Sequence, residues 1–184
     1  MLYTRKGDTG TSGLYGTKER LPKDSPVYEA LGTLDELNSW LGYCRAHTLA
    51  RDQTEGTVEC VLFTIQECLF IVQAEVAGAA KRISQAHVDD LERITAVLEM
   101  RIENPHAFVV PGSTELSGML DYARSVSRRA ERTVVALASE RAISHTTKAY
   151  LNRLSSLLYA TARYVATRAE IQEVAPTYTG AVYK

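Results

Sequence analysis

The chain has 184 residues, a formal net charge of −1, and 45% hydrophobic and 23% charged residues. This length and composition favour one ordinary globular domain, residues 1–184, with a sizeable buried core. The near-zero charge argues against nucleic-acid binding, because proteins that bind nucleic acids usually carry a broad basic surplus.

Secretion and membrane signals are not visible in the sequence. Residues 1–5 lack the apolar core of a signal peptide, and the most apolar run is interrupted by polar residues. The cysteines Cys44, Cys60 and Cys68 form no Cys-x-x-Cys pair and fall in helical patterns. We therefore expect three small core residues in a reducing compartment, and a cytoplasmic protein without a membrane span.

Residues 1–25 differ from the rest of the chain. The segment 4–17 carries four glycines among hydroxyl residues, with Arg5, Lys6 and Lys18 nearby. Glycines allow positive φ and a close backbone approach, and successive N–H groups in such a loop can bind an anion. The spacing is not that of a P-loop. A phosphate-binding loop and a frayed N-terminus both fit this segment.

From Pro26 onward, apolar residues recur at helical spacing. They predict a first helix from Pro26 and four more over about 54–79, 84–103, 113–139 and 144–170, followed by a non-helical tail, 171–184. The predicted core positions are Ala30, Leu34, Leu37, Leu41, Cys44, Val58, Val61, Leu62, Ile65, Leu69, Val72, Val76, Val88, Leu91, Ile94, Leu98, Ile102, Leu116, Leu120, Ala123, Ala130, Val134, Leu137, Leu151, Leu154, Leu158 and Val165. The fold class is thus an all-α, five-helix bundle over 26–170 with ferritin-like up-down helices. Several helices carry a second patterned face, which favours oligomerisation.

The fourth predicted helix carries an arginine row. Arg124, Arg128 and Arg132 are four residues apart, with Glu131 among them. Like charges at this spacing repel by a few tenths of a kcal/mol, so the row favours an anion facing it. The anion could be acidic side chains, solvent ions or a polyphosphate. The simplest interpretation of the arginine row is a basic face exposed to solvent.

Polar residues on two other helices add to this pattern. Asp35 shares a face of the first helix with Ser39 and Gly42, and would need a cation if it were buried. An arginine of another helix or subunit could supply that charge. On the fifth helix a polar stripe places together Asn152, Ser156, Tyr159 and Arg163.

Metal and nucleophile signatures are missing from the sequence. The histidines His47, His87, His106 and His145 lack the paired Glu-x-x-His spacing of di-iron bundles. No Gly-x-Ser-x-Gly occurs, and no cysteine lies in an activating setting. The residues alone therefore indicate an oligomeric helical bundle that binds an anion.

Six motifs stand in the order found in one enzyme family. They are Thr4–Gly10 (TRKGDTG), Lys23–Asp24, Gly32–Ser39 (GTLDELNS), Phe108–Gly112 (FVVPG), Ala123–Arg132 (ARSVSRRAER) and Tyr150–Ser155 (YLNRLS). Together they make the chain similar, over about residues 3–168, to PduO-type ATP:cob(I)alamin adenosyltransferases.

This resemblance implies a homotrimer of five-helix bundles with active sites between neighbouring subunits. It implies transfer of the 5′-deoxyadenosyl group of ATP to cob(I)alamin, which forms adenosylcobalamin and releases triphosphate. Mg²⁺ would accompany the ATP phosphates with few or no protein ligands. The expected partners are a flavin-type reductase and an adenosylcobalamin-dependent enzyme that receives the product. The protein would supply positioning and electrostatics, because the nucleophile belongs to the cofactor.

The resemblance also implies residue roles. The ATP-binding positions are Thr4, Arg5, Gly7, Asp8, Gly10, Thr11, Lys23, Arg128, Glu131 and Asn152. Asp35 and Arg124 would pair across the subunit boundary. Phe108 would bind the lower corrin face, displace the axial base and favour four-coordinate cobalt, which is easier to reduce. The implied catalytic set is therefore Asp35, Arg124, Arg128 and Phe108.

Three residues depart from the family pattern. Ser113 stands where a second glycine is common, Ser156 replaces a common aspartate, and Tyr159 replaces a common phenylalanine. None belongs to the implied catalytic set, so they bear on substrate affinity and corrinoid preference.

Two alternatives come from other functional classes. One is a non-catalytic carrier that binds adenosylcobalamin and delivers it to a dependent enzyme. The other is a helical interaction module that binds neither ligand. The presence of both the ATP-side and the corrin-side positions favours the enzyme.

Overall fold

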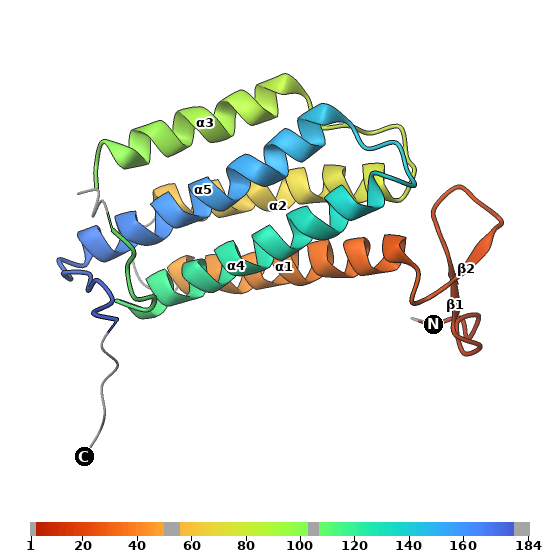
Figure 1. The fold of residues 1–184 in the computed structure, drawn as a ribbon, viewed down its shortest axis with the longest axis horizontal. Helices are drawn as coiled ribbons and strands as arrows, with labels where there is room; N and C mark the ends of the chain where they lie inside the picture. The colour runs from red at the N-terminus through yellow and green to blue at the C-terminus, as the bar shows by residue number, and fades with distance from the viewer. Residues whose placement is uncertain (1–2, 50–55, 103–106, 179–184) are drawn as a thin grey trace, which may run out of the picture.

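The computed structural model of the protein describes residues 3–49, 56–102 and 107–178, and the regular secondary structure within them is mostly helical (Figure 1). The helices are α1 (Pro26–Leu49), α2 (Gly56–Val76), α3 (Gln85–Glu99), α4 (Glu115–Leu137) and α5 (His145–Arg168). The prediction of an all-α fold with five helices is confirmed. Helices α2, α3, α4 and α5 each end two to four residues before the predicted end. One reason is Gly78, whose φ of 96° turns the chain away after α2.

The helices pack around one apolar core. Helix α4 lies against α1 and α5, α2 covers α1, and α3 covers α5 (Figure 1). Every core position predicted on the first, second, fourth and fifth helices is buried. On the third helix, Ile94 and Ile102 are only partly buried, because α3 contacts the bundle mainly through α5.

The N-terminal segment forms a short hairpin that was not predicted. Strands β1 (Thr11–Gly13) and β2 (Arg20–Pro22) pair antiparallel, with Ser12 opposite Leu21. The Arg20 guanidinium donates hydrogen bonds to the carbonyls of Lys6, at 2.6 Å, and Thr11, at 2.8 Å. A segment rich in glycine and hydroxyl residues lacks the apolar alternation that predicts strands, so this arginine bridge could not be foreseen.

The loop before α4 depends on two glycines. Gly112 has a φ of 97°. A Cβ added to Gly118 would come 3.2 Å from the Cα atom of Gly112. The helix then begins with a reciprocal cap: the Thr114 hydroxyl accepts from the Ser117 backbone N–H, and the Ser117 hydroxyl accepts from the Thr114 N–H. This tight turn fixes how residues 107–113 approach the bundle.

Two sequence-based expectations are wrong. Cys60 is exposed on the outer face of α2, whereas Cys44 and Cys68 are buried as expected. Arg163, assigned to a polar stripe, is only 2% exposed and contacts Asp121. Helical periodicity gives the faces of a helix, but a long cationic side chain can be buried where a carboxylate meets it.

Candidate active site

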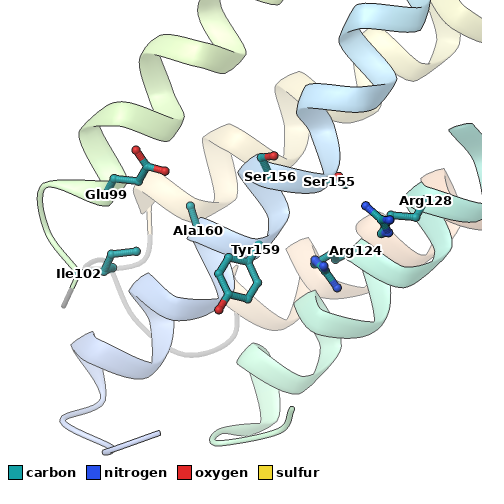
Figure 2. A pocket seen from close by; sticks show the side chains of 8 residues that line it. All are labelled: Glu99, Ile102, Arg124, Arg128, Ser155, Ser156, Tyr159 and Ala160. Atoms are coloured by element: carbon teal, nitrogen blue, oxygen red, sulfur yellow. The ribbon is translucent and has the colours of Figure 1, made fainter. Parts of the chain in front are cut away.

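A cleft of about 370 Å³ lies where α5 runs between α3 and α4. Figure 2 shows Arg124 and Arg128 entering it from α4, opposite Tyr159 and the two serines of α5, with Glu99 on the α3 side. The lining residues are Glu99, Ile102, Arg124, Arg128, Ser155, Ser156, Tyr159 and Ala160. Two of the predicted site residues therefore share one cleft.

The cations of this cleft have no carboxylate partner among the residues that the structure describes. The guanidinium carbon of Arg124 lies 5.4 Å from the centre of the Tyr159 ring, and Arg128 is exposed. By contrast, Arg129 pairs with Glu36, and Arg153 pairs with Glu92 at 2.9 Å. The cleft thus presents two charges, one helical turn apart, that can take an anionic ligand.

A second cleft, of about 550 Å³, adjoins the first. Its wall includes Phe108, which is 79% exposed, and it shares Arg124 and Tyr159 with the arginine cleft. The lining residues are Ala107, Phe108, Val109, Pro111, Asp121, Arg124, Ser125, Tyr159 and Arg163. One side of Arg124 thus faces a cationic cleft and the other a more apolar one.

Two predicted ATP-side residues are hydrogen-bonded to each other. The Asn152 side-chain amide of α5 donates to the Glu131 carboxylate of α4 at 2.9 Å. The Asn152 oxygen accepts from Arg153, which continues to Glu92 on α3. This chain of contacts joins α3, α4 and α5 and fixes the orientation of the Asn152 amide.

The predicted N-terminal phosphate residues lie together in one turn. A Cβ on Gly7 would come 3.0 Å from the Lys23 amino nitrogen, and the Lys23 backbone N–H donates to the Gly10 carbonyl at 2.9 Å. Arg5 has a φ of 59°, and its carbonyl accepts from the Asp8 N–H at 3.3 Å. The side chains of Thr4, Arg5, Asp8 and Lys23 are exposed, and that of Thr11 is half-buried. The turn presents cationic and hydroxyl groups to solvent.

Within one chain, the N-terminal segment and the loop before α4 lie at opposite ends of the bundle (Figure 1), and the second cleft is lined by residues of that loop. The hairpin adjoins the start of α1, where Leu14 and Leu21 line a cleft with Gly78 and Arg141. Asp35 is exposed on α1 and makes no ion pair with another described residue, while its neighbour Glu36 pairs with Arg129. The predicted Asp35–Arg124 pair is therefore not formed inside one subunit, and its formation between subunits stays a prediction.

The described residues contain no cluster of three or more histidine, cysteine, aspartate or glutamate side chains that could hold a metal ion. In the same part of the chain, no helix combines the length and the apolar character needed to cross a bilayer. His106 lies outside the described residues.

Sequence reasoning missed a buried network beside the Phe108 cleft. Arg163 contacts Asp121 and Glu173 at 2.7 and 2.8 Å, and Glu173 accepts a hydrogen bond from Ser113 at 3.1 Å. Arg20, which bridges the N-terminal turn, was also missed. Neither group carries a motif, and only the tertiary structure brings residues 121, 163 and 173 together.

The sequence matches the cobalamin adenosyltransferase family profile over residues 2–165. The chain belongs to this family. It is 38% identical to the corrinoid adenosyltransferase PduO of Salmonella typhimurium, over 98% of this chain and 55% of the relative. It therefore spans about half the length of that relative, and 56% of its Citrobacter freundii counterpart. A corrinoid adenosyltransferase of Bacillus subtilis is 37% identical over 94% of this chain and 90% of its own.

The fold of this family member also matches solved structures. One is a phenylalanine-to-alanine variant of a PduO-type ATP:corrinoid adenosyltransferase from Lactobacillus reuteri, complexed with cobalamin and ATP. It is 30% identical, with a TM-score of 0.87 over 96% of this chain and 99% of that one. An arginine-to-lysine variant from the same organism, complexed with ATP, is 30% identical, with a TM-score of 0.86 over 95% and 99% of the two chains. The resemblance stated from the six motifs is confirmed.

Proposed function

We propose that the chain transfers the 5′-deoxyadenosyl group of ATP to cob(I)alamin, which forms adenosylcobalamin and releases triphosphate. The observation that carries the proposal is the pair of adjoining clefts. One contains Arg124 and Arg128 without carboxylate partners among the described residues, and the other contains the exposed Phe108. Family membership and the Lactobacillus reuteri complexes with cobalamin and ATP support the same reading.

The reaction requires no nucleophile from the protein. The electron pair of Co(I) attacks C5′ of ATP and forms the Co–C bond, while the C5′–O bond breaks and its electrons leave with the triphosphate. Negative charge therefore grows on the oxygen of the leaving group. Guanidinium groups already in place stabilise that charge without reorganisation, and each such donor is worth about 10²–10³ in rate. Arg128 and Arg124 have this role in the proposal.

The N-terminal turn would bind the same triphosphate. Lys23 beside Gly7, together with Thr4, Arg5, Asp8, Gly10 and Thr11, provides charge, hydroxyls and backbone N–H groups for phosphate oxygens. Glu131 and Asn152 would contact the nucleoside. Mg²⁺ would arrive on the phosphates, because the described residues offer no protein cluster for it. When bound there, it neutralises phosphate charge.

A homotrimer explains why the phosphate turn and the clefts lie apart in one chain. In the proposed assembly, the turn of one subunit covers the arginine cleft of its neighbour, and Asp35 pairs with the neighbour's Arg124. Asp35, which has no ion-pair partner among the described residues, supports this arrangement. So do the exposed Tyr43 and Tyr122, which pack on Trp40 and make an aromatic surface that a partner would cover.

On the corrin side, Phe108 would occupy the lower face of the macrocycle and exclude an axial ligand. Without that ligand, Co(II) is four-coordinate and easier to reduce to the nucleophilic Co(I). The high exposure of Phe108 on the rim of the more apolar cleft supports this role. A flavin-type reductase, a product-receiving enzyme and a cytoplasmic location remain predictions of the same proposal.

One incubation tests the activity. Protein, ATP, Mg²⁺ and prereduced cobalamin are mixed, and the adenosylcobalamin spectrum is followed. Turnover supports the transferase. Binding of adenosylcobalamin without turnover supports the carrier, and failure to bind ATP and cobalamin supports the interaction module.

A further inference from the structure

The tail after α5 returns to the loop that carries Phe108. Helix α5 ends in a left-handed turn at Glu170, whose φ is 57°, and the Ile171 N–H bonds the Ala166 carbonyl at 3.2 Å. This turn sends the tail back toward the start of α4. There the Val110 N–H donates to the Val174 carbonyl at 2.8 Å. The tail therefore pairs with the loop, residues 107–113, through the backbone.

The Glu173 side chain strengthens this attachment. Its Oε1 accepts a hydrogen bond from the Ser113 hydroxyl at 3.1 Å and lies 2.8 Å from Nε of Arg163. The Nε–H group has no aligned hydrogen-bond acceptor, so the contact with Glu173 is ionic. Glu173 thus links a loop residue to a side chain of α5 that is 98% buried, since Arg163 retains an exposed fraction of 2%.

Arg163 does not depend on Glu173 for charge balance. Its Nη2 atom donates to Asp121 at 2.7 Å. Burial opposes the charge of Arg163, but the Asp121 hydrogen bond and charge, with smaller contributions from Tyr159 and Glu173, raise its pKa above the ordinary value. Glu173 is therefore a second carboxylate on a cation that is already neutralised. What it adds is the connection between tail and loop.

The same network reaches the wall between the two clefts. Arg163 lies 4.8 Å from the centre of the Tyr159 ring, and Arg124 lies 5.4 Å from it. One continuous set of contacts thus runs from the arginine cleft through Tyr159 and Arg163 to Glu173 and the Phe108 loop. A change at Glu173 is expected to alter the loop more than the helices, because Asp121 still holds Arg163.

We propose that Glu173 is a positioning residue that holds Phe108 in the second cleft by fastening loop 107–113 to the buried Arg163. Ser113, which stands where the family commonly has glycine, supplies the hydroxyl that completes this fastening in the present chain. The fastening itself follows from the contacts, whereas its effect on the reaction rests on the proposed function.

Hydrogen exchange of the Val110 amide in the full chain tests the fastening without any ligand. The isosteric Glu173→Gln removes the charge but keeps the shape, and we expect about tenfold faster exchange, the effect of losing one charge-assisted contact. Ser113→Ala leaves both carboxylates on Arg163, so it should fold normally and give a smaller increase. Glu140→Gln, just beyond the far end of α4, is the matched control and should change nothing at Val110. Unchanged exchange in both Glu173→Gln and Ser113→Ala overturns the proposal.

The effect on the reaction is tested separately. We expect Glu173→Gln to slow the reaction that starts from Co(II) several-fold more than the reaction from prereduced Co(I), as expected for Phe108→Ala. When Glu173→Gln is added to Phe108→Ala, the rate from Co(II) should fall no further than in Phe108→Ala alone, because both changes act through Phe108. Full additivity contradicts the positioning role. If the parent protein shows no transfer at all, the proposed function fails, and the exchange experiment still decides whether Glu173 fastens the loop.

Discussion

The guanidinium group of Arg124 stacks on the ring of Tyr159, with 5.4 Å between the guanidinium carbon and the ring centre. Arg163 approaches the same ring at 4.8 Å, so one aromatic side chain supports two cations. Tyr159 therefore orients Arg124 without neutralising it, because an aromatic face attracts a cation but leaves its N–H donors available. A carboxylate in this place would compete with an anionic ligand.

Replacing Tyr159 tests this support. Tyr159→Leu removes both cation–π contacts, and we expect it to lower the free energy of unfolding by about 1–2 kcal/mol. Tyr159→Phe keeps the ring and should retain most of that stability. Urea denaturation of the three proteins measures the difference. Equal destabilisation by Phe and Leu would show that the hydroxyl, rather than the ring, matters.

Arg128→Ala should reduce turnover by about 10²–10³-fold, because it removes a preorganised donor from the leaving triphosphate. Arg128 is exposed, so the unfolding transition should stay unchanged. The matched control is Arg93→Ala on α3, which breaks only a local, exposed ion pair with Asp90. Steady-state kinetics with ATP and prereduced cobalamin give the comparison. Wild-type rates in Arg128→Ala would remove this residue from the polyphosphate site.

Phe108→Ala should slow the reaction that starts from Co(II) more than the reaction from prereduced Co(I). The proposed role of the ring is to keep an axial ligand away from cobalt, and this matters for reduction rather than for the later attack on ATP. Val110→Ala, a change to another exposed side chain of the same loop, is the control. Losses of equal size from the two starting states would argue for a simple binding role.

Gly7→Ala should raise the KM for ATP several-fold while cobalamin binding is retained. The new methyl group would sit 3.0 Å from the Lys23 amino nitrogen and displace it from the turn. Gly13→Ala is a matched control in the same segment, because its methyl group would meet only the Glu19 carbonyl at an ordinary 3.6 Å. Separate titrations with ATP and cobalamin measure the effect. Identical behaviour of the two variants would exclude Lys23 from ATP binding.

Stability should fall at alkaline pH. Burial raises the pKa of Cys44 from 9.0 to about 12, and burial also raises the pKa values of Cys68 and Tyr150. Above pH 9.0 the unfolded chain loses protons that the folded chain keeps, so the free energy of unfolding decreases as pH rises toward 12. Denaturation curves at several pH values measure this slope, and a constant free energy of unfolding between pH 9 and 11 would contradict it.

Thiol labelling at neutral pH should modify Cys60 first, because it alone of the three cysteines is exposed.

Much of the bundle could be predicted from the sequence because helical periodicity is a local property. Residues three and four apart share a face, so a stripe such as Leu34, Leu37 and Leu41 identifies the buried side before any partner is known. The caps Thr114 and Ser144, which the structure shows, are also local, because each side chain accepts a hydrogen bond from the backbone N–H three residues later. Spacing also placed Arg124 and Arg128 on one face, and they line one cleft.

Other features depend on contacts between distant segments. The exposure of Cys60 is a different case, because this residue falls outside the buried stripe of Val61, Ile65 and Cys68, so helical spacing alone places it on the outer face of α2. Arg20 bridges strands that composition did not predict, because its acceptors are backbone carbonyls, which every sequence has. Backbone carbonyls form a binding site for one particular arginine only after the chain has folded around that side chain.

By itself, the sequence determined the helices, their buried faces and the family of this protein, since periodicity and ordered motifs can be read along the chain. Only the tertiary structure decided that Arg124 separates two clefts and that Glu173 fastens the Phe108 loop to Arg163. The Ser113–Glu173 and Asp121–Arg163 contacts join residues 60 and 42 positions apart. A buried cation such as Arg163 is tolerated only beside its carboxylates, and that environment exists only after the helices have packed.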